Sequence, residues 1–106
     1  MEIKNIANEL AGLEKYSPEY METGARMARK VAEDIKAEIL SRGYQQVVFI
    51  DRPDMGGVNV CIRGCDEDIA INLWYGYEPA VRGETFCPGC DTIEDVVDAY
   101  LEIIDI

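Results

Sequence analysis

The sequence predicts a single α+β domain with elements in the order α-α-β-β-β-α, in which a long helix and a C-terminal helix cover a three-stranded antiparallel meander. Three observations lead to this prediction. Apolar residues recur at helical spacing before residue 43, they alternate with polar residues in short runs between 44 and 75, and helical spacing returns after residue 91. A chain of 106 residues is also of ordinary length for one domain with one core.

Two helices are expected at the start of the chain. The first lies within 1–16, where apolar residues share one helical face: Ile3, Ile6, Ala7, Leu10 and Leu13. The second and longer helix spans 17–42. Ser17 is a favourable N-cap, Pro18 suits the first helical position, and Gly43 is a stop signal.

A sheet is expected over 44–75, because three short runs rich in β-branched or aromatic residues follow one another with turn-forming residues between them. Short connections favour antiparallel pairing. In the second run Val58, Val60 and Ile62 share one face, and Asn59, Cys61 and Arg63 share the other. If the third run continues to Tyr75, Trp74 and Tyr75 point to opposite faces. One of them then belongs to the core. The other, together with Tyr77, is a candidate anchor for a partner. The alternative is that these rings pack laterally under the connector that follows.

A connector over 76–90 leads to an acidic helix over 91–105. Asp91 and Glu94 resemble a capping box at its start. Its apolar stripe predicts the buried side: Ile93, Val96, Val97, Tyr100, Leu101 and Ile104. Its polar side is formed by Glu94, Asp95, Asp98, Glu102 and Asp105.

The acidic residues are the strongest functional signal. The net charge is −11, and residues 83–106 hold seven acids and no base. On the last helix Glu94, Asp98 and Glu102 lie at i, i+4 and i+8 and form a row of like charges about 6 Å apart. Such a row destabilises an isolated helix, so its presence indicates that a partner binds it. The acids between the second and third runs extend this candidate partner-binding surface: Asp66, Glu67 and Asp68. The alternative is a face that is simply solvated.

Four cysteines form two pairs, CIRGC with Cys61 and Cys65, and CPGC with Cys87 and Cys90. Together they are candidate ligands of one zinc ion, although the first pair can chelate only if Gly64 bends the chain back. A CxxC before a helix is also a candidate thiol-redox motif. The third interpretation is reduced thiols in a turn and a strand.

The chain lacks histidine and any recognisable catalytic constellation, so no catalytic residue is assigned and a non-enzymatic role is expected. The helix–meander–helix order is similar to that of double-stranded-RNA-binding domains in topology only, because the charge has the wrong sign for direct nucleic-acid binding. In size, charge and build the chain resembles small acidic phage and mobile-element proteins that mimic nucleic acid. The expected function is an acidic protein-binding module that engages a basic, nucleic-acid-binding protein, in its sharpest form as an inhibitor.

Two alternatives stay open, a small zinc-binding or thiol-redox protein centred on CPGC and a structural domain that forms homo-oligomers through its first helix. No apolar run approaches membrane-spanning length, and the start of the chain lacks the layout of a signal peptide. A cytoplasmic location without membrane contact is therefore expected, and it implies reduced thiols.

Overall fold

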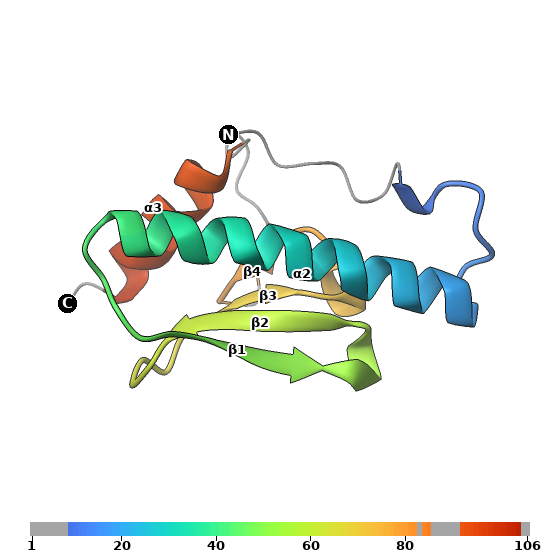
Figure 1. Cartoon of the computed structure of the whole chain (residues 1–106), viewed down its shortest axis with the longest axis horizontal. Coiled ribbons are helices and arrows are strands. Elements are labelled where there is room, and N and C mark those ends of the chain that lie inside the picture. Colours follow the sequence, from blue (N-terminus) through green and yellow to red (C-terminus); the bar gives the residue numbers. More distant parts are fainter. Residues whose placement is uncertain (1–8, 83, 86–91, 105–106) are drawn as a thin grey trace.

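The computed structural model describes residues 9–82, 84–85 and 92–104 and has the α+β fold predicted from the sequence (Figure 1). Its helices and strands are α2 (Pro18–Ser41), β1 (Val47–Arg52), β2 (Gly57–Ile62), β3 (Ile69–Ile71), β4 (Ala80–Val81), β5 (Glu84–Thr85) and α3 (Ile93–Ile104). Two 3₁₀ turns interrupt this order, η1 (Pro53–Met55) and η2 (Leu73–Tyr75). No helix in the described part of the chain combines the length and apolar character needed to cross a membrane.

The long helix α2 begins and ends close to where the sequence predicts. The Ser17 side chain accepts a hydrogen bond from the backbone N–H of Tyr20 at 3.2 Å, as expected of an N-cap, and Pro18 occupies the first position. Arg42 is the C-cap. Of the helix expected within 1–16, residues 1–8 lie outside the described part of the chain. Glu9 and Leu10 are helical, and Leu10 reaches the core.

In the described residues the sheet contains five antiparallel strands in the order β1-β2-β3-β4-β5, rather than the three expected. The first three strands coincide with the predicted runs, and Val60 of β2 lies opposite Phe49 of β1 and Ile69 of β3. The two additional strands fall within the expected connector 76–90. They have only two residues each, which is too short for an alternating pattern to be visible in the sequence.

The third strand is shorter than predicted, because it ends at Ile71 instead of continuing to Tyr75. The Asn72 side chain accepts a hydrogen bond from the Trp74 N–H at 3.1 Å and thereby caps the 3₁₀ turn η2. Gly76 closes that turn in the left-handed conformation, with φ of 64°. Trp74 and Tyr75 therefore lie in a tight turn and not on opposite faces of a strand.

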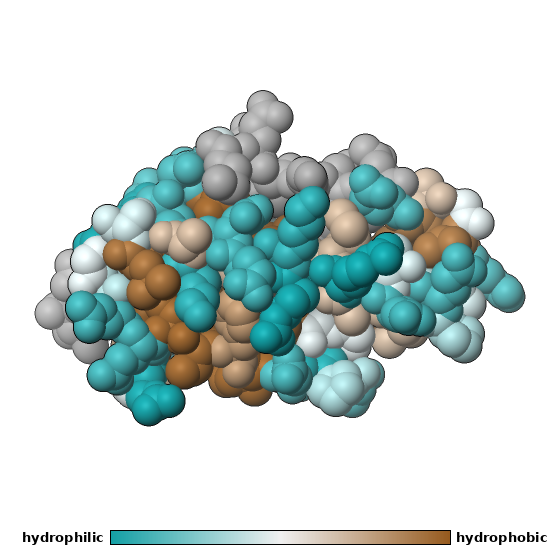
Figure 2. Space-filling view, in the orientation of Figure 1, coloured by the Kyte–Doolittle hydropathy of each residue, from teal (hydrophilic) through white to brown (hydrophobic). Residues whose placement is uncertain are grey.

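The two helices lie on the same side of the sheet, with α3 next to the C-terminal half of α2 (Figure 1). Between them and the sheet lies the core, which includes Ile35, Ile39, Val58, Val60, Ile69, Ile71, Val96, Val97 and Tyr100. The solvent side of α2 is covered mainly by polar side chains (Figure 2). On α3, the buried stripe is the one predicted, with Ile93, Val96, Val97 and Tyr100 buried and Leu101 and Ile104 packed against them.

Tyr77, a candidate contact residue for a partner, is instead one of the most buried side chains, with 1 % of its surface accessible, so the alternative of packing applies to it. Its ring lies against Gly24 of α2, where a Cβ atom would come within 2.2 Å of the ring carbon Cζ. The glycine in the middle of the helix is therefore explained by close packing. Tyr77 can no longer be considered a contact residue for a partner.

The second face of β2 is also less exposed than strict alternation implies. Asn59 and Cys61, predicted to lie opposite the apolar face, keep only 6 % and 7 % of their surface accessible. The sheet thus has a packed helix-facing side and an outer side that is polar but partly enclosed.

Candidate functional site

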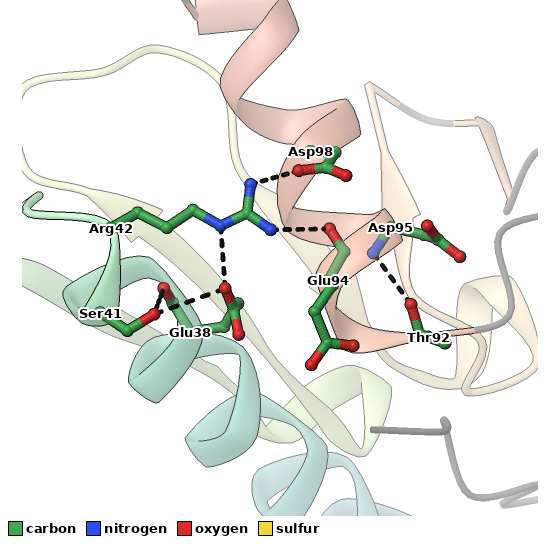
Figure 3. Close-up of polar contacts among 7 residues, drawn as sticks. All are labelled: Glu38, Ser41, Arg42, Thr92, Glu94, Asp95 and Asp98. Atoms are coloured by element: carbon green, nitrogen blue, oxygen red, sulfur yellow. Dashed lines mark hydrogen bonds and ion pairs between the residues drawn. The ribbon is translucent and has the colours of Figure 1, made fainter.

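The acidic side of α3 is connected to the end of α2 by one guanidinium group (Figure 3). Arg42 forms an ion pair with Asp98, donates a hydrogen bond to the Glu94 carbonyl oxygen at 3.2 Å, and pairs with Glu38 at 2.9 Å. The hydrogen bonds to Glu38 and Asp98 raise the pKa of Arg42 above its ordinary value. Residues 83–106 contain no lysine or arginine that could offset the negative charge of α3. Arg42, at the end of α2, is the base that offsets part of it.

Only part of the acidic side of α3 is therefore open to a partner. Asp98 and Glu102 are exposed, while Glu94 and Asp95 are half-buried. Within residues 92–104, Asp98 has an ion pair and Glu102 has none to any other described residue. Asp105 lies outside the described part of the chain.

The start of α3 differs in detail from the prediction. The helix begins at Ile93, and the Thr92 hydroxyl accepts a hydrogen bond from the Asp95 N–H at 3.2 Å, so Thr92 is the residue that caps it (Figure 3). Asp91, the expected cap, lies outside the described residues. A hydrogen bond from its own backbone N–H lowers the pKa of the Glu94 carboxyl, which keeps this group charged in the positive first turn of the helix.

The acidic loop between β2 and β3 lies beside α3, and Tyr100 joins them. Its hydroxyl donates to the Glu67 carbonyl oxygen at 2.8 Å and accepts from the Ile62 N–H at 3.1 Å. Burial raises the pKa of Tyr100 to about 12, and the nearby Cys65, Cys61 and Asp68 act in the same direction. Two acidic segments that are far apart in sequence are therefore held together by one buried side chain.

The three loop acids have different environments. Glu67 pairs with Arg82 at 3.0 Å, and Asp68 accepts a hydrogen bond from the Asn59 amide at 3.1 Å. Asp66 is exposed and forms no ion pair with the described part of the chain. Among the predicted contact residues, Asp66 and Glu102 are thus the acids most available to a partner.

The chain bends back at Gly64, as Cys61 and Cys65 require if both are to bind one metal ion. Gly64 has a φ of 90°, and the Cys65 N–H donates to the Ile62 carbonyl oxygen at 3.0 Å, so the chain does turn between the two thiols. Burial, followed by the charges of Asp68 and Cys65, raises the pKa of Cys61. No group of three or more potential metal ligands occurs among the described residues. Cys87 and Cys90 lie outside them, so the expected zinc site stays a prediction.

The outer side of the sheet contains a hollow that the sequence did not predict. It has a volume of about 410 Å³ and lies between the η1 and η2 turns and the strands β2, β3 and β4. Its polar lining includes Asn59, Asn72 and Asp68, and Trp74, with 75 % of its surface accessible, lies at its margin. The signal in the sequence was Asn59, because asparagine is disfavoured within a strand. Asn72 lies just beyond the end of β3 and caps η2.

Comparison of the chain with protein-family models, with curated proteins and with solved structures finds no match.

Proposed function

We propose that the protein is a non-enzymatic binding module whose acidic surface engages a basic protein, of the kind that otherwise holds nucleic acid. The observation that supports this proposal is the pair of hydrogen bonds made by Tyr100, which fix the acidic β2–β3 loop beside the acidic helix α3. We call the exposed acids of these two segments, Asp66, Asp98 and Glu102, the acidic surface.

The electrostatics favour a cationic partner. The net charge of −11 repels nucleic acid and attracts basic surfaces over a distance of about one Debye length. Carboxylates in rows can replace backbone phosphates as the groups that lysine and arginine contact. A protein with a nucleic-acid groove presents such cations in a row, which makes it the partner class of best charge complementarity.

The rigidity of the acidic surface is a second supporting feature. The Asp98 carboxylate is held by Arg42, and the backbone of the β2–β3 loop is held by Tyr100 at the Glu67 carbonyl oxygen, so one carboxylate and the loop that carries Asp66 are positioned before a partner arrives. Groups that are already ordered lose less conformational entropy on binding. A merely solvated acidic face has no need of such fixation.

The test is a double charge reversal, Asp66→Lys with Glu102→Lys, which leaves the Arg42 and Tyr100 contacts in place. The matched control is Glu14→Lys with Glu22→Lys, two exposed positions near the start of α2, at the other end of the molecule from α3 (Figure 1). In both variants two changes of +2 bring the net charge from −11 to −7.

Each variant is immobilised and used to capture proteins from a cell lysate, and bound proteins are released with duplex DNA or RNA as competitor. We expect a nucleic-acid-releasable protein on the wild type and on the control, with capture reduced at least tenfold for the acidic-surface variant. Equal losses in both variants would show that only net charge matters, and undiminished capture by the acidic-surface variant would refute the proposal.

A further inference from the structure

The strand β1 lies at one edge of the sheet, and no described segment pairs with its outer side. The Arg63 N–H donates to the Gln46 carbonyl oxygen at 2.9 Å, and the pairing of β1 with β2 continues in this register without a bulge. In an antiparallel pair every second residue of a strand directs its backbone groups to the neighbouring strand, so the even-numbered residues of β1 face β2. The N–H and C=O groups of the odd-numbered residues face outward, without a partner among the described residues: Val47, Phe49 and Asp51.

This edge has little of the protection that sheet edges usually have. Natural proteins protect an unpaired strand with lysine, proline, a bulge or a covering segment. The sequence of β1 is VVFIDR, in which four apolar residues of high strand propensity precede the first charge. Ile50 keeps 45 % of its surface exposed, and Val48 and Phe49 are half-buried. Apolar side chains also gather between the C-terminal half of α2 and the start of β1, so this edge favours pairing with another strand (Figure 2).

Two cations of α2 lie over the aromatic ring on this edge. The Phe49 ring centroid is 4.4 Å from Arg29 Cζ and 5.4 Å from Lys36 Nζ. Arg29 also pairs with Asp51 at 2.8 Å, and Lys36 lies about 10 Å farther along the helix. Arg29 is therefore at the Asp51 end of β1, and Lys36 is at the Val47 end. Lys36 forms no ion pair with the described residues, so its charge is available to a partner.

The strand β1 is complementary to a second copy of itself in the antiparallel orientation. A two-fold axis at Phe49 pairs this residue with Phe49 of the second copy, and it pairs Val47 with Asp51 of the second copy. Each outward-facing residue is then in a hydrogen-bonded pair, which gives about six backbone hydrogen bonds between the copies. A shift of the register towards the end of the strand would pair Pro53, which has no N–H to donate.

The charges favour the same pairing. It brings Asp51 of the second copy opposite Val47, at the end of β1 where Lys36 has no ion-pair partner among the described residues. Symmetry gives two such contacts, one on each side of the axis. Residues 47–52 contain one acid and one base, a net charge of 0, whereas the whole chain carries −11. Two strongly acidic chains repel each other, and this neutral edge is a place where they can approach closely.

We propose that the protein forms a symmetric dimer in which β1 pairs with β1 of a second copy and joins the two sheets into one. The two Phe49 rings pack at the axis, between the two copies of α2. On the outer side, Val48 packs on Ile50 of the second copy. The inference is independent of the proposed function, because α3 contacts α2 and β4, towards the other edge of the sheet. The dimer therefore presents two acidic surfaces.

The molar mass tests the dimer. Sedimentation equilibrium of the full chain at micromolar concentrations should give twice the 11.9 kDa of one chain. Ile50→Lys changes an exposed side chain, so the fold is retained, and the variant should be monomeric because the charge lies in the interface. The matched control Trp74→Lys makes the same change of charge at an exposed apolar residue outside β1, and it should stay dimeric. A monomeric wild type would overturn the inference and leave the edge as a site for a strand of another protein. A dimer that survives Ile50→Lys would overturn it in favour of another surface.

Cross-linking tests the register. In a hydrogen-bonded pair the two Cα atoms are about 5.5 Å apart, which is within the range of a disulfide. Phe49→Cys, oxidised with oxidised glutathione, should therefore link the two introduced thiols across the axis, and peptide mass spectrometry separates this bond from those of the native cysteines. Ile50→Cys should link far more slowly, because its two copies are diagonal neighbours about 7–8 Å apart. Equal yields from the two variants, including no link in either, would overturn the proposed register.

A third variant tests the charge complementarity. Lys36→Gln should raise the dissociation constant of the dimer about tenfold, because symmetry removes two contacts with Asp51 at once. Arg26→Gln, at an exposed arginine of the same helix, is the control and should leave the constant unchanged. An unchanged constant for Lys36→Gln would contradict the pairing of Val47 with Asp51. The acidic-surface variant Asp66→Lys with Glu102→Lys should remain dimeric, so loss of partner capture and loss of the dimer are separate results.

Discussion

Replacement of Gly24 by alanine tests the packing that fixes α2 on the sheet. Alanine in a helix interior is ordinarily more favourable than glycine by about 0.5–1 kcal/mol. Here the added Cβ would lie 2.2 Å from Tyr77 Cζ and 2.3 Å from its hydroxyl oxygen. Tyr77 has little room to retreat, because Gly56 lies on the same hydroxyl, with a Cβ there only 3.0 Å away.

Overpacking of a filled core costs about 1–3 kcal/mol, and a clash with a ring confined on two sides belongs at the upper end of that range. After subtraction of the gain in helix propensity, we expect Gly24→Ala to lower the free energy of unfolding by about 2 kcal/mol. The sign of this change in the free energy of unfolding is informative, because helix propensity alone predicts that Gly24→Ala stabilises the protein.

Urea unfolding of a double-mutant cycle with Tyr77→Leu measures the effect. In the leucine background the ring is gone, and Gly24→Ala should become neutral or stabilising. Ala37→Gly, at an exposed position of the same helix, supplies the propensity term and should destabilise by about 0.5–1 kcal/mol. A stabilising Gly24→Ala in the wild-type background would refute the packing argument.

Three further predictions concern groups described above. Arg42→Ala should lower the free energy of unfolding by about 1–2 kcal/mol, because the partly buried guanidinium loses its pair with Glu38 and its hydrogen bond to the Glu94 carbonyl oxygen. Calorimetry should show no such loss for Arg26→Ala, an exposed arginine on the same helix. Tyr100 should stabilise the fold fully below pH 10, and this stability should be lost as the pH rises towards its folded pKa of about 12. Thermal unfolding from pH 9 to 12 should show a smaller pH dependence in Tyr100→Phe. Cys61 should react with iodoacetamide more slowly than Cys65, since burial raises its pKa, and peptide mass spectrometry gives both rates; equal rates would contradict the assigned burial.

The sequence predicted those parts of the fold that have a repeating pattern. The stripe of α2, the strands β1 and β2 and the buried side of α3 all follow from spacing over six or more residues. The Ser17 cap follows from the preference of serine for the N-cap position. The end of β3 could not be predicted in this way, because it is decided by one hydrogen bond that the Asn72 side chain accepts from the Trp74 N–H. Tyr77 was placed wrongly for a related reason: its burial depends on a glycine in another element.

The acidic residues of the candidate site could be predicted from the sequence, but their positions relative to one another could not. Counting charges identified the acidic residues of α3 and of the β2–β3 loop. Their adjacency depends on Tyr100, and the partial neutralisation of Asp98 depends on Arg42, which is 56 residues away in sequence. The hollow was missed because side-chain hydrogen bonds connect Asn59 of β2 with Asp68 and Asn72 at the two ends of β3, and such a connection has no signature in local sequence.

The ion pair between Arg42 and Asp98 joins the two ends of a chain segment that contains the five described strands, from Val47 to Thr85. The helical layer is therefore assembled from chain segments on either side of the sheet, and neither helix has a core of its own. Within residues 9–82, 84–85 and 92–104 this arrangement leaves no subdomain that can unfold separately, so unfolding should be cooperative. Trp74 fluorescence, which reports the outer side of the sheet, and far-ultraviolet circular dichroism, which reports the helices, should then give the same midpoint.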